Sequence, residues 1–177
     1  MPVAVTEENI CNANALFWEQ MLAMRVEPIQ RATEAEVHCI GAEHLVGSCD
    51  LAGVWIGRIE VRLSHGLAMQ ATSAMLMQPV ESVQPDDALD AIREIANMIA
   101  GTIKSALPRP CTMTVPSAEV EPADFCILPR TDDSVTVFFR HTAGELMVRV
   151  WQQMPCAAPK PATEPKSETH LLAQMCA

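Results

Sequence analysis

The strongest constraint on the fold is a helical hydrophobic stripe that runs from about Asp87 to Leu107. At about 100° per residue, its apolar members lie within about 60° of Ile92 on either side; they are Ile92, Ile95, Ala96, Ile99, Ile103 and Leu107. Pro85 introduces the stripe, and the Pro-Arg-Pro run at 108–110 ends it. A helix that is apolar on one face has to pack that face on another layer of structure.

Alternating segments predict a sheet as that layer. In residues 54–63, every second side chain is apolar or glycine, and the residues between them include Arg58, Glu60 and Arg62. This period of two is typical of a strand with one wet face. We also predict a strand over 36–47, with a turn at 47–53 between the two.

The later part of the chain predicts further strands. A short strand is expected at 111–115, another near 125–128, and a hairpin over 135–150 that turns at Ala143 and Gly144.

Two more helices are expected, over 6–24 with Thr6 as N-cap and over 64–77 with Ser64 as N-cap. The predicted fold class is therefore α+β, with a mainly antiparallel sheet of about five to six strands and long helices packed on it. Residues 1–153 form one domain in this interpretation. Residues 154–177 read as a flexible proline-rich tail.

Charge and cysteine usage narrow the class of function. The formal net charge of −10 argues against binding to nucleic acid or to an anionic membrane. There is no apolar run of the ~20 residues that span a bilayer, and Glu7 and Glu8 stand where a signal peptide carries basic residues. The seven cysteines are scattered, without the spacing of a zinc site. We expect a cytoplasmic protein with no metal site of its own.

The helix at 87–107 carries a second pattern, opposite its apolar stripe. Its members are Asp90, Glu94, Asn97 and Gly101, flanked by Arg93 and Lys104. Polar residues are expected on the solvent side of any amphipathic helix, and Asp90 fits the N3 partner of an Asp87 N-cap. Asn97 and Gly101 are less easily explained, because both disfavour a helix and neither faces the core. A glycine here suits the close approach of another protein's backbone.

These residues resemble a known family. The run from Asp90 to Gly101, followed by Cys111-Thr-Met-Thr-Val-Pro116, is similar to the signature of the CheC/CheX/FliY chemotaxis phosphatases, with the CheX-like branch nearest because one E-x-x-N helix is visible. The order of elements over residues 5 to 152 also fits. One departure is that 18 residues separate Asn97 from Pro116, about one helical turn fewer than is common, which leaves open whether Pro116 is the family proline.

The resemblance implies hydrolysis of the aspartyl phosphate on a CheY-type receiver domain. Asn97 would orient the attacking water and Glu94 would pair with the receiver's lysine, which makes them the candidate catalytic residues. The candidate partner-binding residues are Asp90, Arg93, Gly101 and Lys104, with Asp90 as a cap or a peripheral docking charge. Mg²⁺ would belong to the receiver, and this chain would bind no cofactor.

Alternatives remain open at this point. The same helix face fits a non-catalytic CheX-like module that binds a receiver or another signalling protein. A small-molecule enzyme has little support, because no phosphate-binding glycine loop or nucleophile constellation is visible. Arg58 and Arg62 are interpreted as solvated strand charges rather than docking residues. CheX-like relatives often join or swap strands, so a homodimer is expected from the resemblance.

Overall fold

The computed structural model describes residues 5–29, 43–122 and 134–152. These residues form an antiparallel sheet of seven strands in the order β1-β6-β7-β3-β2-β4, and β5 also pairs with β2. The predicted α+β class is confirmed, with a slightly larger sheet than expected. The strands are β1 (Glu27–Ile29), β2 (His44–Gly53), β3 (Gly57–Ser64), β4 (Cys111–Met113), β5 (Ser117–Glu121), β6 (Ser134–His141) and β7 (Gly144–Gln152).

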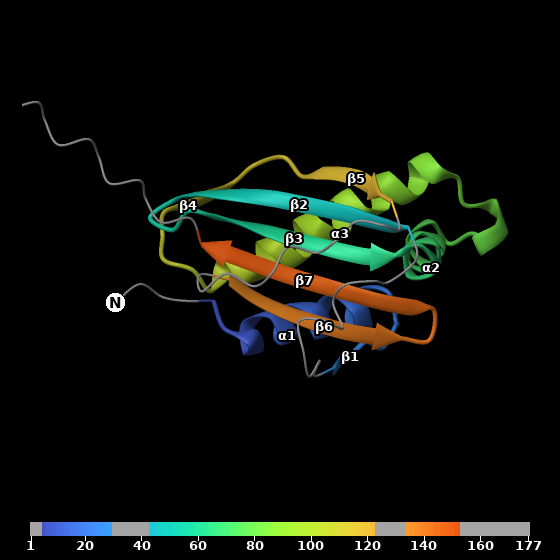
Figure 1. Cartoon of the computed structure of the whole chain (residues 1–177), viewed down its shortest axis with the longest axis horizontal. Coiled ribbons are helices and arrows are strands. Elements are labelled where there is room, and N and C mark those ends of the chain that lie inside the picture. Colours follow the sequence, from blue (N-terminus) through green and yellow to red (C-terminus); the bar gives the residue numbers. More distant parts are fainter. Residues whose placement is uncertain (1–4, 30–42, 123–133, 153–177) are drawn as a thin grey trace, which may run out of the picture.

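Two helical segments cover one face of the sheet, as Figure 1 shows. One is α1 (Glu7–Ala15), which continues as the π-helix η1 (Leu16–Met21), and the other is the long α3 (Pro85–Ser105). Helix α2 (His65–Leu76) lies at one end of the sheet and leads through the 3₁₀ turn η3 (Val80–Ser82) into α3. All three predicted helices are present.

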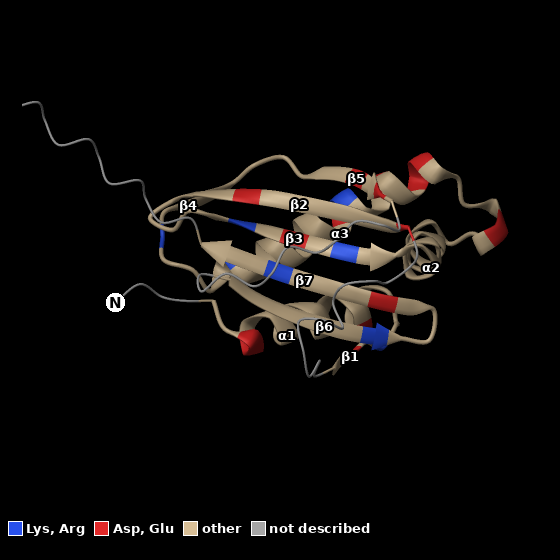
Figure 2. Cartoon of the chain, viewed as in Figure 1, with Lys and Arg blue, Asp and Glu red and all other residues tan. Residues whose placement is uncertain are grey.

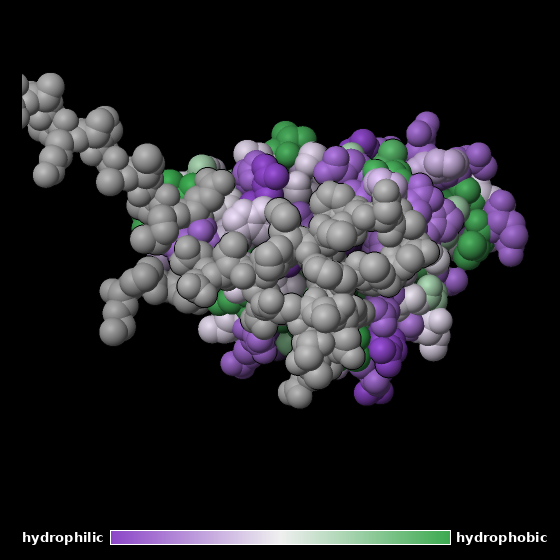
Figure 3. Space-filling view, in the orientation of Figure 1, coloured by the Kyte–Doolittle hydropathy of each residue, from purple (hydrophilic) through white to green (hydrophobic). Residues whose placement is uncertain are grey.

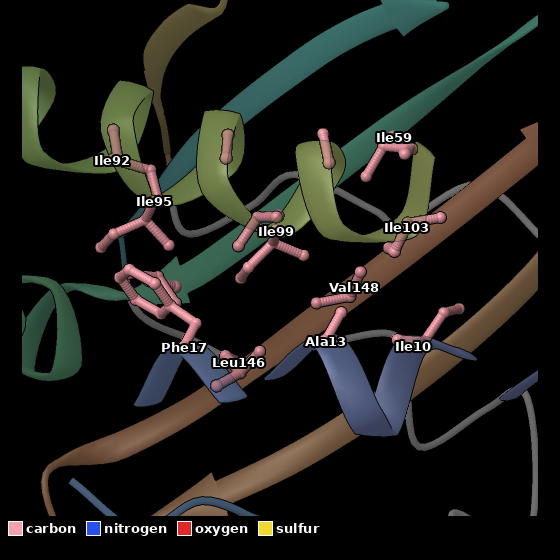
Figure 4. Close-up of a cluster of buried hydrophobic side chains, with 14 of the residues drawn as sticks. Ile10, Ala13, Phe17, Ile59, Ile92, Ile95, Ile99, Ile103, Leu146 and Val148 are labelled. Atoms are coloured by element: carbon pink, nitrogen blue, oxygen red, sulfur yellow. The ribbon is translucent and has the colours of Figure 1, made fainter. Parts of the chain in front are cut away.

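The core lies between these helices and the sheet. The four isoleucines of the α3 stripe, Ile92, Ile95, Ile99 and Ile103, are each at most 1% exposed. In Figure 4 their side chains meet those of Ile10, Ala13 and Phe17 from the first helix and Leu146 and Val148 from β7. The stripe therefore fixes which way α3 faces, because turning the helix would bring these side chains into water.

The prediction of a turn at 47–53 is wrong. These residues belong to β2, and the connection to β3 is the short segment 54–56. Glycine, serine and aspartate favour turns in general, but here Asp50 and Ser48 point away from the helices and pair across strands, whereas Gly47 faces α3. The predicted strand is confirmed from His44 onward, and residues 36–42 lie outside the described part.

The predicted hairpin is confirmed, but its turn lies one residue earlier than expected, at Thr142 and Ala143, and Gly144 is the first residue of β7. Ser64 does precede α2, but its hydroxyl oxygen accepts a hydrogen bond from the backbone N–H of Glu145 at 3.1 Å instead of capping the helix.

The strand predicted at 111–115 is present as the shorter β4. Strands β1 and β5 were not predicted. The strand expected near 125–128 and the tail expected at 154–177 lie outside the described residues.

Candidate functional site

Helix α3 begins earlier than its sequence pattern indicates. Its N-cap is Gln84 and its first residue is Pro85, a position where the missing N–H of proline costs no hydrogen bond. Asp87 is the third helical residue, and its carboxylate accepts from the backbone N–H of Gln84 at 3.1 Å. The prediction of Asp87 as N-cap with Asp90 as its N3 partner is therefore wrong. The carboxylate of Asp90 instead accepts a hydrogen bond from Arg93.

A close contact with the sheet sets the position of α3. A β-carbon added at Gly47 of β2 would lie 2.7 Å from the carbonyl oxygen of Ile92 and 2.8 Å from the β-carbon of Ala96. Only glycine lets the strand and the helix approach so closely. The helix is thus held against β2 at the turn that also carries Glu94 and Asn97 on its opposite side.

Glu94 and Asn97 are placed as the helical wheel predicts. Glu94 is exposed and Asn97 is half-buried, on the side of α3 away from the isoleucine stripe. Residues three apart on a helix are neighbours, with β-carbons about 5–6 Å apart. In the part of the chain that the structure describes, neither side chain makes a hydrogen bond or an ion pair. A carboxylate and an amide are thus available side by side.

The next turn of the same face is open. A β-carbon added at Gly101 would have no atom of the described residues within 4 Å, so no contact with them requires a glycine there. Lys104 follows on the last turn, half-buried and without an ion pair among the described residues. The outward face of α3 therefore carries a paired Asp90 and Arg93, open space at Gly101, and three side chains without a partner in the described ranges, Glu94, Asn97 and Lys104.

Pro116 lies in the connection between β4 and β5. Strand β5, which follows this connection, packs against α3. The identity of Pro116 as the family proline stays a prediction.

Both arginines of β3 are paired with carboxylates, Arg58 at a partly exposed position and Arg62 at a buried one. Arg58 donates to both carboxylate oxygens of Asp50, at 2.5 and 2.9 Å. Arg62 is 5% exposed and is paired with Glu121 and Glu60. Both arginines alternate along β3 with buried core residues, so their side chains lie on the face of the sheet opposite the helices. Figure 2 shows residues of both charges along the strands. The interpretation of Arg62 as a solvated charge is wrong, and neither arginine lies on the α3 face.

The surroundings of three groups on the sheet shift their pKa values. The guanidinium of Arg58 lowers the pKa of Asp50, through its hydrogen bonds first and its charge second. Burial raises the pKa of Glu121 in spite of its contact with Arg62. Burial likewise raises the pKa of the Cys49 thiol to about 11, so this buried cysteine is a poor nucleophile at neutral pH.

The rest of the described surface shows few features that indicate another functional site. Residues 5–29, 43–122 and 134–152 contain no cluster of three or more His, Cys, Asp or Glu side chains suited to a metal ion. No helix in these ranges is long and apolar enough to cross a membrane. On the face seen in Figure 3, the hydrophobic residues in view form small, separate groups at the margin.

Comparison with known proteins supplies the family. The model of the family described as "Chemotaxis phosphatase CheX" matches residues 45–139, which is more than half of the chain. This range contains nearly all of β2, then β3, α2, α3, β4, β5 and most of β6, and therefore the whole candidate site on α3. No curated protein matches the chain.

Several solved structures share the fold. A chemotaxis protein CheX from Desulfovibrio desulfuricans is 20% identical, with a TM-score of 0.66, over 82% of this chain and 97% of that one. A chain of the CheX-CheY-BeF3-Mg²⁺ complex from Borrelia burgdorferi is 15% identical, with a TM-score of 0.59, over 83% and 97%. Thermotoga maritima FliY is 15% identical, with a TM-score of 0.52, over 83% and 91%.

Proposed function

The chain belongs to the CheX family, and on this premise we propose that it hydrolyses the aspartyl phosphate of a CheY-type receiver domain in chemotaxis or two-component signalling. The observation that carries the proposal is the pair of polar side chains, Glu94 and Asn97, that stand three residues apart on the outward face of α3 and have no partner in the described part of the chain. The Borrelia burgdorferi structure of similar fold is named as a CheX-CheY complex, which supports a receiver as the partner.

To hydrolyse an aspartyl phosphate, this chain mainly has to position the attacking water and the charged groups around it. An acyl phosphate is already activated, so hydrolysis needs a water held in line with the phosphorus and charges arranged around it. The amide of Asn97 offers both an acceptor for a water proton and donors, and it does not titrate. In this proposal Asn97 orients the water, and Mg²⁺ belongs to the receiver.

Glu94 fixes the docking register. Its exposed carboxylate would pair with the lysine that receivers carry beside the phosphorylated aspartate, in a charge-assisted hydrogen bond. Gly101, with open space where a β-carbon would stand, allows the receiver backbone to come close to the helix. Lys104 adds a cation, which helps encounter with an acidic phosphorylation site despite this chain's net charge of −10.

Two broader features complete the proposal. We place the protein in the cytoplasm, together with the receiver domains that it would act on, and we expect a homodimer, as the family resemblance implies. Sedimentation at several protein concentrations measures directly whether the homodimer forms.

The proposal is tested by phosphate release from a Mg²⁺-loaded, phosphorylated receiver domain of the same cell. The native chain should accelerate release, and Asn97→Ala and Glu94→Ala should each lose at least about tenfold of that acceleration. The matched controls are Asn12→Ala and Glu19→Ala, exposed residues of the same types on the first helical segment, which should keep it.

Two results would count against the proposal. One is a native chain that accelerates release from no receiver of the cell. The other is an Asn97→Ala variant as active as the native chain. A native chain that binds a phosphorylated receiver without accelerating hydrolysis would instead identify the non-catalytic module.

A further inference from the structure

Arg93 stands between two possible partners on α3. Asp90 precedes it by three residues and Asn97 follows it by four, and both spacings bring side chains together on a helix surface. The guanidinium has five N–H donors and no acceptor, so either the Asp90 carboxylate or the Asn97 amide oxygen can receive one. The partner that Arg93 takes therefore decides whether the amide oxygen of Asn97 is available to the water.

The structure shows which partner holds it. Arg93 donates to Asp90, and the two side chains are 42% and 78% exposed. The side chain of Asn97 makes no hydrogen bond within the described ranges. Glu94 does not compete for the guanidinium, because neighbouring residues in sequence point in different directions on a helix. The pair with Asp90 thus keeps Arg93 on the N-terminal side, away from Asn97.

We propose that Asp90 is a positioning residue that holds Arg93 off Asn97 and so leaves the Asn97 amide oxygen free to accept a proton of the attacking water. This inference rests on the proposed function. It explains why an acidic residue stands one turn before Glu94 although Gln84 and Asp87 already cap the helix. Asp90 itself touches neither water nor phosphate in this scheme.

The test is a double-mutant cycle in the receiver assay. Asp90→Ala should lower kcat by about twofold with KM unchanged, since an exposed helical ion pair is weak. Adding Arg93→Ala should restore kcat to that of the Arg93→Ala variant, because no guanidinium is left to reach Asn97. Asp90→Glu keeps the carboxylate and should behave like the native chain.

A second readout does not depend on catalysis. The side-chain amide signal of Asn97 in ¹H–¹⁵N spectra of the free protein should move in Asp90→Ala and return in the double variant. If the native chain accelerates no hydrolysis, the proposed function fails, and this signal still decides whether Asp90 controls Arg93.

The inference is overturned if the Asn97 amide signal is the same in Asp90→Ala as in the native chain. It is also overturned if an activity loss in Asp90→Ala persists after Arg93 is removed, because Asp90 then acts by itself. An Asp90→Ala variant with native kcat, in an assay where Asn97→Ala is inactive, removes the inference and leaves the proposed function standing.

Discussion

The polar face of the sheet and the outward face of α3 carry the same kinds of residue, but only α3 places two unpaired polar side chains together among the described residues. On the sheet, Arg58 is paired with Asp50, and Arg62 with Glu121 and Glu60; Figure 2 shows how the two signs of charge intermingle there. On α3, Glu94 and Asn97 have no partner in the described structure. The difference teaches that the type of residue does not mark a binding surface. What sets Glu94 and Asn97 apart is that they have no partner among the described residues and stand together at the turn of α3 that packs on Gly47.

The largest effect is expected on the sheet. Arg62→Ala leaves Glu121 and Glu60 with an uncompensated buried charge, because the Arg62 and Glu121 side chains are only 6% and 14% exposed. Breaking such a pair costs about 3–5 kcal/mol of unfolding free energy. Arg58→Ala is the matched control, since its pair with Asp50 is 42% and 46% exposed and should cost at most about 1 kcal/mol.

Urea unfolding of both variants measures this contrast. If Arg62→Ala and Arg58→Ala unfold at the same urea concentration, the buried pair is no more important to stability than the exposed one. The sheet face would then be a solvated surface, and its contrast with α3 would lose its basis.

The second effect compares two glycines on either side of α3. Gly47→Ala forces a β-carbon against Ile92 and Ala96, and should destabilise the protein by about 1–3 kcal/mol. Gly101→Ala meets no atom and removes a helix-disfavouring residue, so it should stabilise by up to about 1 kcal/mol. Thermal unfolding measures both changes: the melting temperature should fall in Gly47→Ala and rise in Gly101→Ala.

Gly101→Ala also separates stability from function. If the receiver approaches the helix at this point, the more stable variant should bind the receiver less tightly, which calorimetric titration measures. Unchanged affinity would mean that the receiver's backbone does not come close to Gly101, and the docking surface on α3 would end before it.

The smallest effect is a dependence on pH. Arg58 lowers the pKa of Asp50 in the folded protein, so the ionised carboxylate stabilises the fold above its unfolded value of about 3.9. That contribution is lost as the pH falls through the lower, folded pKa. The unfolding free energies of the native chain and Asp50→Asn should thus differ by at most about 1 kcal/mol near pH 6 and converge in acid.

Convergence is the decisive part of that measurement. A difference that stays constant from about pH 6 down to pH 3 would show that Asp50 stabilises the strand pair through packing or shape and not through its charge.

The features of α3 were predictable because they are local. Its stripe repeats at the helical period, prolines mark both ends, and the outward placement of Glu94 and Asn97 follows from the wheel alone. The burial of Arg62 was not predictable, because its partner Glu121 lies 59 residues away. The partner of Asp90 could be predicted only in part. The i, i+3 spacing permits a pair with Arg93, but the N-terminus at Gln84, which frees Asp90 from capping, is visible only in the structure.

The sheet was less predictable than the helix for a related reason. Gly47, Ser48 and Asp50 look like turn residues, yet each owes its type to a contact made across the fold with α3, β5 or β3. Strands β1 and β5 span three and five residues, too short for an alternating pattern to stand out. Pairing with β6 and β2 holds them in place.

The central claim is that the free polar groups of α3, and not the paired ones of the sheet, meet the receiver. It is tested most directly by recording the backbone amide signals of this chain while a receiver domain carrying Mg²⁺ and beryllofluoride is added. The account predicts that the largest shifts fall at Glu94, Asn97 and Gly101, with Arg58 and Glu60 unchanged. Shifts confined to the sheet face, with the α3 signals unmoved, would contradict it.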